Sequence, residues 1–138
     1  MRNSLLAIII LFSTIASGQD KSAETPKIAI KISQGETVVI KGVSIKFVEV
    51  VEDSRCPTGV DCIWAGRAKV KTSVTVNGKT EEKILIFGEV RPGEDEGTNL
   101  YSSTKFAING LKLTPYPNAK TVGEIENYVL LVCEEKNN

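Results

Sequence analysis

Alternation of apolar and polar residues constrains the fold of this 138-residue chain more than any other feature. Isoleucine stands at every second position in the segment 28–32, and the same period recurs in 43–47 and 67–76. Successive side chains of a β-strand point to opposite faces, so each segment is expected to bury one face and expose the other. Val, Ile and Thr, which favour strands, outnumber Leu and Ala almost threefold after residue 18. The chain is therefore predicted to be all-β.

The pattern predicts strands at 28–32, 36–41, 43–47, 67–76, 79–87, 104–113 and 127–134. Asn77-Gly78 tolerates the positive φ angles of a type I′ turn and predicts a tight hairpin between the fourth and fifth strands. The segment 88–103, with Pro92 and three glycines, is expected to be a long surface loop, and Pro115-Tyr116-Pro117 to end the sixth strand. About seven antiparallel strands favour a Greek-key-like two-sheet sandwich, with a partly closed barrel as the alternative.

The N-terminal segment has the pattern of a secretory signal peptide. Arg2 precedes an apolar run at 5–15, and the small residues Ala16, Ser17 and Gly18 suit signal peptidase. Cleavage is expected after Gly18, with a cut after Gln19 as the alternative, which leaves 19–138 as a single domain. The run is shorter than the roughly 20 apolar residues of a membrane span, and no lipobox cysteine follows it. These features predict a secreted or periplasmic protein without a membrane span.

Charge and composition narrow the classes of function. Lys and Arg number 17 and Asp and Glu number 17, so no basic excess points to nucleic acid or to an anionic membrane as a partner. The chain contains no histidine, which removes Ser-His-Asp and Cys-His catalytic pairs and His-ligated zinc. A general acid or base would have to be built from other side chains.

Three cysteines in an exported protein imply one pair and one remaining thiol. Cys56 and Cys62 flank Pro57-Thr58-Gly59-Val60-Asp61, where the proline and glycine favour a tight reversal, so we pair these two. A disulfide over so short a loop contributes about 2 kcal/mol in the chain-entropy model, and its role is to fix the shape of the loop. Cys133 is expected to be a small buried hydrophobe in the last strand, and its pairing with either loop cysteine is the alternative.

The residues around this pair carry a resemblance. The stretch Ser54-Arg55-Cys56-Pro57-Thr58-Gly59-Val60-Asp61-Cys62-Ile63-Trp64-Ala65-Gly66 resembles the SRCPxGVxCxWAG signature of small secreted or lipid-anchored bacterial proteins of the Bacteroidetes type. Those proteins continue with a hairpin, a leucine-rich strand that ends in Pro-Tyr-Pro and a final Tyr-x-Leu-x-Val strand, which the segments 111–117 and 128–132 match. The resemblance implies a secreted β fold and gives no residue a catalytic role. The chain departs from the anchored members because it lacks their lipobox cysteine.

Four residues of the segment 53–67 are candidates for binding: Arg55, Asp61, Trp64 and Arg67. Trp64 could stack on a sugar or another partner, but we favour a position against the disulfide that closes one end of the sandwich, because large aromatics are mostly buried. Arg55 and Asp61 bracket the loop and are expected to form an ion pair across its neck. Arg67 is expected to point to Asp53 or Glu52.

Neither a metal nor a cofactor is predicted. The C-x5-C spacing differs from the C-x-x-C of thiol oxidoreductases. The acidic run Glu94-Asp95-Glu96 lacks the EF-hand order and is expected to be a solvated loop. Some pair of carboxylates could act in a hydrolase, but nothing in the sequence marks two as partners.

These observations favour an exported, non-enzymatic β module that recognises an unidentified protein or glycan through the disulfide-closed loop 53–66. The first alternative is a protease inhibitor that uses the loop between Cys56 and Cys62. A structural envelope component and a carboxylate-based hydrolase are weaker alternatives.

Overall fold

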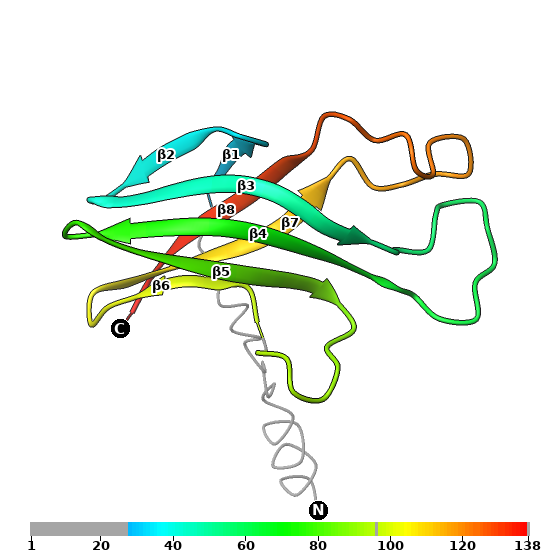
Figure 1. The fold of residues 1–138 in the computed structure, drawn as a ribbon. Helices are drawn as coiled ribbons and strands as arrows, with labels where there is room; N and C mark the ends of the chain where they lie inside the picture. The colour runs from blue at the N-terminus through cyan, green and yellow to red at the C-terminus, as the bar shows by residue number, and fades with distance from the viewer. Residues whose placement is uncertain (1–27, 96, 138) are drawn as a thin grey trace, which may run out of the picture.

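The computed structural model describes residues 28–95 and 97–137, whose eight strands form two antiparallel four-stranded sheets (Figure 1). The strand order is β1-β8-β7-β6 in one sheet and β2-β3-β4-β5 in the other. The strands are β1 (Ala29–Ser33), β2 (Thr37–Ile40), β3 (Val43–Asp53), β4 (Arg67–Val76), β5 (Lys79–Gly88), β6 (Asn99–Ser102), β7 (Phe106–Thr114) and β8 (Val129–Lys136). The two open sheets confirm the predicted sandwich rather than the barrel. The predicted signal peptide, residues 1–18, lies outside the described residues.

The core lies between the two sheets and is built from the residues that alternate in the sequence. One sheet contributes Ile45, Phe47, Val70 and Leu85, and the other contributes Ile32, Ile108, Leu130 and Val132. All are essentially inaccessible to solvent, and burial of each such side chain stabilises the fold by about 1.5–3 kcal/mol. The predicted two-faced strands are thereby confirmed for β3 and β4, whereas Ile28, predicted on the buried face of the first segment, precedes β1 and is 79% exposed.

The hairpin of β4 and β5 is confirmed with its predicted turn. Val76 pairs with Lys79, and Asn77 and Gly78 have φ angles of 50° and 77°. Both angles lie in the left-handed region that a type I′ turn requires. Along the hairpin, Lys69 and Lys71 face outward from β4 and form ion pairs with Glu94 and Glu82.

Two strands, β3 and β6, differ from the prediction by more than two residues at an end. β3 continues to Asp53, because its pairing with β4 continues to that residue. Shifts in register between Phe47 and Glu49 and between Val50 and Glu52 break the alternation, so the sequence pattern ends earlier than the strand. β6 lies inside the segment predicted to be a long loop. Leu100 is its only fully buried residue, and four residues are too few to show a period.

The loops at 54–66 and 115–128 lie together at one end of the sandwich, away from the β4–β5 turn (Figure 1). The first loop joins β3 to β4, the two inner strands of one sheet, and the second joins β7 to β8, the two inner strands of the other. Among the described residues, no helix has the length and apolar character needed to cross a membrane.

Candidate functional site

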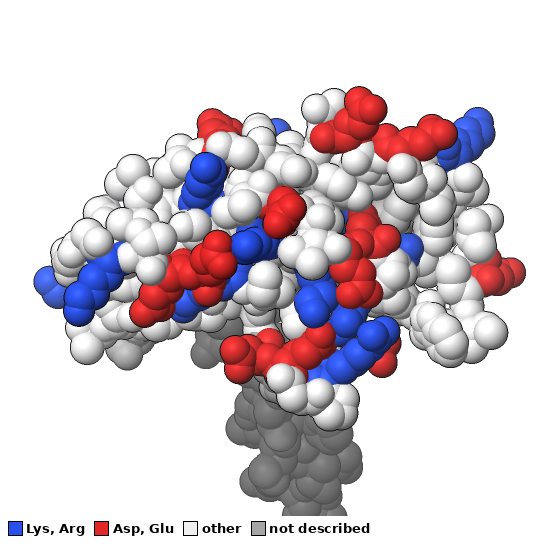
Figure 2. Space-filling model, viewed as in Figure 1, with Lys and Arg blue, Asp and Glu red and all other residues white. Residues whose placement is uncertain are grey.

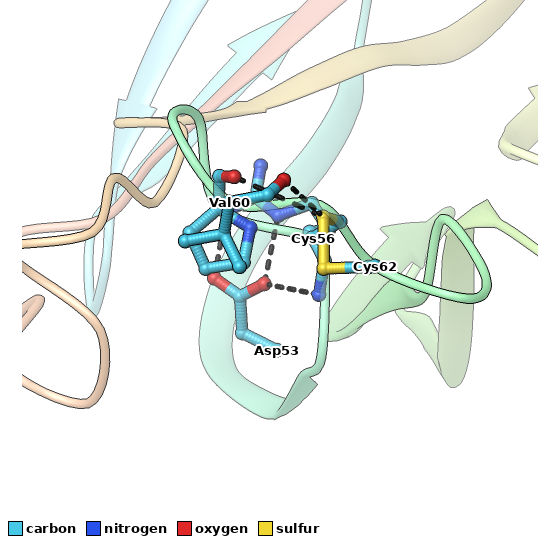
Figure 3. Close-up of a disulfide and its surroundings, with 6 residues drawn as sticks. Asp53, Cys56, Val60 and Cys62 are labelled. Atoms are coloured by element: carbon cyan, nitrogen blue, oxygen red, sulfur yellow. Dashed lines mark hydrogen bonds and ion pairs between the residues drawn. A yellow bond between two sulfur atoms is a disulfide. The ribbon is translucent and has the colours of Figure 1, made fainter.

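The loop 54–66 is closed by the predicted disulfide. Cys56 and Cys62 are bonded, and their Cα atoms are 6.0 Å apart (Figure 3). Between them the chain reverses direction, because the Val60 N–H donates to the Pro57 carbonyl at 3.3 Å and Gly59 has a φ of 83°. Cys133 is fully buried in β8, as expected. Its alternative pairing with a loop cysteine is wrong, because Cys56 and Cys62 are bonded to each other.

Main-chain hydrogen bonds hold this loop at its neck and against its neighbour. At the neck, the Cys56 N–H donates to the Ala65 carbonyl at 2.8 Å. Further out, the Thr58 N–H donates to the Pro117 carbonyl at 3.0 Å, and the Ala119 N–H donates to the Thr58 carbonyl at 3.2 Å. The two loops therefore form one tied structure at the end of the sandwich.

Arg55 joins both loops to the end of the sandwich. Its Nε and Nη2 donate to the two carboxylate oxygens of Asp53, each at 2.7 Å. Nη1 donates to the Leu113 carbonyl at 2.8 Å, Nη2 also donates to the Pro115 carbonyl at 3.1 Å, and the guanidinium lies 4.9 Å from the ring centre of Tyr116. The predicted ion pair with Asp61 is wrong, because Arg55 instead forms a bidentate pair with Asp53 through Nε and Nη2.

The Asp53 carboxylate is shielded and fully partnered. The Tyr128 hydroxyl donates to its Oδ2 at 2.9 Å. Burial by itself raises the pKa of Asp53, but the hydrogen bonds from Arg55 and Tyr128 outweigh burial and hold that pKa below its ordinary value. Burial and the same hydrogen bond raise the pKa of Tyr128 to about 12. Asp53 is thus ionised and Tyr128 protonated at neutral pH.

Arg67 anchors the long loop that follows β5. Arg67 donates to both carboxylate oxygens of Glu52, at 3.1 and 3.2 Å, and Glu52 is one of its two predicted partners. Arg67 also forms an ion pair with Glu94. Lys69 donates to the other oxygen of Glu94 at 2.9 Å. The loop 89–98 is therefore held over the outer face of β4. The predicted acidic loop is not simply solvated, because Glu94 faces two cations.

We expect this attachment to loosen in acid. The hydrogen bond from Lys69, then those from the Arg91 N–H and from Arg67, lower the pKa of Glu94 to about 2. Because the pKa of Glu94 is lowered, the stabilisation that its carboxylate gives to the loop is complete above the ordinary pKa of 4.5. That stabilisation is lost as the pH falls through about 2. NMR titration of the Gly93 and Asp95 amides should show a midpoint near the lower value, and Glu94→Gln should remove it. A midpoint near 4.5 would contradict the attachment.

Five apolar side chains stand exposed on the two tied loops, and we call them the tip patch: Val60, Ile63 and Trp64 of the first loop and Tyr116 and Val122 of the second. Ile63 is 93% exposed and Trp64 is 71% exposed. The favoured prediction for Trp64, burial against the disulfide, is therefore wrong. Figure 2 shows acidic and basic side chains interleaved over β4 and β5, and at the end with the two loops it shows mostly acidic charged side chains among uncharged ones.

Exposure of Trp64 is open to direct measurement, because it is the only tryptophan of the chain. We expect acrylamide to quench its fluorescence in the folded protein almost as strongly as in the urea-unfolded protein. The emission maximum should also shift little on unfolding. Strong protection from acrylamide that disappears in urea would place the indole in the interior instead.

The four candidate residues occupy two different settings. Arg55 and Arg67 are buried at the neck of the loop and bind carboxylates of the protein itself, whereas Asp61 and Trp64 are exposed. Sequence reasoning missed Tyr116 and Tyr128 as members of the site. The signal for Tyr128 was its place on the same face as Leu130 and Val132, at the start of the last strand. Within the described residues, no three His, Cys, Asp or Glu side chains gather as a metal site.

Comparison with known proteins adds no relative to this description: no family model, no curated protein sequence and no solved structure matches the chain.

Proposed function

We propose that this protein is an exported, non-enzymatic β module that recognises a protein partner through the tip patch. The observation that carries the proposal is the near-complete exposure of Ile63 and Trp64 on a loop that is fixed by a disulfide. Exposed apolar side chains that cluster on a surface mark interaction sites. The disulfide and the signal peptide predicted for residues 1–18 support a place outside the cytoplasm.

Rigidity of the tip supports recognition by lowering its entropic cost. Ordering a loop and its side chains on binding costs about 0.5–1.5 kcal/mol for each immobilised side chain with many rotamers. Here the disulfide, the Thr58 main-chain bonds and the Arg55 contacts fix the backbone of the loop before any partner arrives. Tryptophan is also the residue type most often found to carry binding energy in protein interfaces.

The chemistry of the tip favours a protein over a glycan. Val60, Ile63 and Val122 are aliphatic and exposed, and aliphatic side chains fill apolar pockets of proteins. The ionisable residues exposed on the same loops are Asp61, Lys120, Glu124 and Glu126, which sum to a net negative charge. The partner surface that fits best is an apolar pocket with a basic rim.

The test compares retention of partners from the secreted or periplasmic fraction of producing cells. We expect the double variant Ile63→Ser, Trp64→Ser to lose at least about thirtyfold in affinity for a partner retained by the wild type, the equivalent of 2 kcal/mol. The control is Val39→Ser, which removes an equally apolar side chain that is 69% exposed on β2. Both variants should match the wild type in thermal stability.

Three results would redirect the proposal. Equal retention by the double variant and the wild type would remove the tip patch as the recognition site. Loss of retention on addition of free oligosaccharide would indicate a glycan partner. Inhibition of serine or cysteine proteases at micromolar concentration would favour the inhibitor alternative. The main chain of Thr58 is already bonded to the neighbouring loop, so it is not available to pair with a protease cleft.

A further inference from the structure

A groove of about 570 Å³ opens between β5 and β7, next to the loop 54–66. One wall is the segment 111–114 of β7 and the other is the segment 86–88 of β5. Arg55 and Tyr116, the one member of the tip patch that also lines the groove, lie at one end, and Thr98 lies at the end where β6 begins. Phe87, Leu111 and Leu113 give the groove a largely apolar lining.

The edge of β7 along this groove is only half covered. β6 pairs with Ala107, Ile108 and Asn109, and its line ends where the Gly110 N–H donates to the Thr98 carbonyl at 2.7 Å. Beyond Gly110, no strand in the described part of the chain pairs with 111–114 on this side. Arg55 marks the far end of the open stretch by its bond to the Leu113 carbonyl, an oxygen with a second lone pair. An open strand edge is a template for another extended chain.

The charges that line the groove are both positive. Arg55 is neutralised by the buried carboxylate of Asp53, which leaves the exposed Lys112 as the charge that an occupant would meet. No carboxylate occurs among the described residues that line the groove. The complementary occupant is therefore apolar and carries a carboxylate.

We propose that the groove binds an extended peptide segment of a protein partner, which adds as a short strand beside 111–114 in line with β6. Alternate apolar side chains of the segment would lie against Phe87 and Leu111, and an acidic side chain or terminal carboxylate would lie near Lys112. Main-chain hydrogen bonds supply affinity and the side-chain pockets supply selectivity in this mode of binding. The inference goes beyond the function proposed above, because it requires no contact from Ile63 or Trp64.

A segment of this chain fits the groove poorly. Residues 19–27 are mostly polar, contain Pro26 and precede β1. β1 is the edge strand on the opposite side of the same sheet from β6. An apolar segment from another molecule matches the lining better.

The test begins with a random nine-residue peptide library displayed on phage and selected on the full mature protein. We expect enriched peptides with alternating apolar residues and one carboxylate, and a synthetic copy should slow hydrogen exchange of amides within 111–114. Leu111→Glu, which changes an exposed side chain, should weaken the synthetic peptide at least tenfold. Lys46→Glu, an exposed charge reversal on β3, should not, and N-methylation of alternate peptide residues should abolish binding.

Other outcomes overturn the proposal. Failure to enrich any peptide, or protection of amides at the β2 edge instead, would remove the groove as a peptide site. Binding to phosphatidylcholine vesicles that Leu111→Glu abolishes would assign it to lipid, and a dimer that the same variant dissociates would assign it to a second copy. Peptide binding should persist in the Ile63→Ser, Trp64→Ser variant, so failure of the tip patch and failure of the groove can be told apart.

Discussion

Arg55→Ala is expected to lower the free energy of unfolding by about 3–5 kcal/mol, because it leaves a buried carboxylate without its cation. The side chains of Arg55 and Asp53 are only 7% and 10% exposed. The same substitution removes the donor from the carbonyls of Leu113 and Pro115. Urea denaturation followed by circular dichroism measures the loss, since an exposed Trp64 reports little on unfolding.

The matched control for this prediction is Lys71→Ala. It breaks an ion pair with Glu82, whose side chain is 65% exposed, and exposed pairs contribute about 0–1 kcal/mol. The loss in free energy of unfolding for Arg55→Lys should lie between those of Arg55→Ala and Lys71→Ala, because lysine keeps the charge and loses the bidentate geometry. The ionised Asp53 carboxylate contributes to stability above the ordinary pKa of 3.8, and this contribution is lost as the pH falls through the lower pKa of Asp53 in the folded protein. Equal losses for Arg55→Ala and Lys71→Ala would contradict the role of Arg55.

Gly66→Ala is expected to destabilise the protein by about 3 kcal/mol or more, among the larger effects of single substitutions. Gly66 has a φ of 70°, and an added Cβ would lie 1.8 Å from the Ser54 carbonyl oxygen. The obstacle is main chain at the neck of the loop, so the strands β3 and β4 would have to separate there. Thermal unfolding and the intensity of the Cys56 amide signal should both report the change.

Gly59→Ala separates strain from steric conflict. Gly59 has a similar φ of 83°, but an added Cβ there meets nothing within 4 Å. Its cost should be only the 1–2 kcal/mol or so of a left-handed residue with a side chain. If both variants unfold at the same temperature, the close approach of Gly66 to the Ser54 carbonyl does not contribute to the loss of stability.

Local patterns predicted the sandwich because they act over a few residues. The alternation of Ile45 and Phe47 determined which face is buried, and Asn77-Gly78 determined the turn. The pairing of Cys56 with Cys62 followed from a proline and a glycine that reverse the chain between them. Each of these signals lies within a few neighbouring residues. None of them depends on a contact with a distant part of the sequence.

The errors concern contacts that only the assembled fold determines. Arg55 was expected to pair with Asp61 across the loop, but its guanidinium pairs with Asp53. The fold also brings to it, from a distant part of the sequence, the carbonyls of Leu113 in β7 and of Pro115 just after β7. Trp64 was expected to be buried because its size favours burial, yet its loop is held at the end of the sandwich (Figure 1) with Trp64 71% exposed. β6 was missed because its four residues are too few to show alternation. It is a strand because it pairs with β7 in the folded protein.

Photocrosslinking from the tip patch tests recognition most directly. A photoreactive phenylalanine analogue would replace Ile63 in one variant and Val39 in another, and both would be irradiated in the cells that produce the protein. We predict a discrete adduct with a single protein from position 63 and none from position 39, which is also exposed and apolar. Similar adducts from both positions, or none from position 63, would contradict a recognition role for this surface.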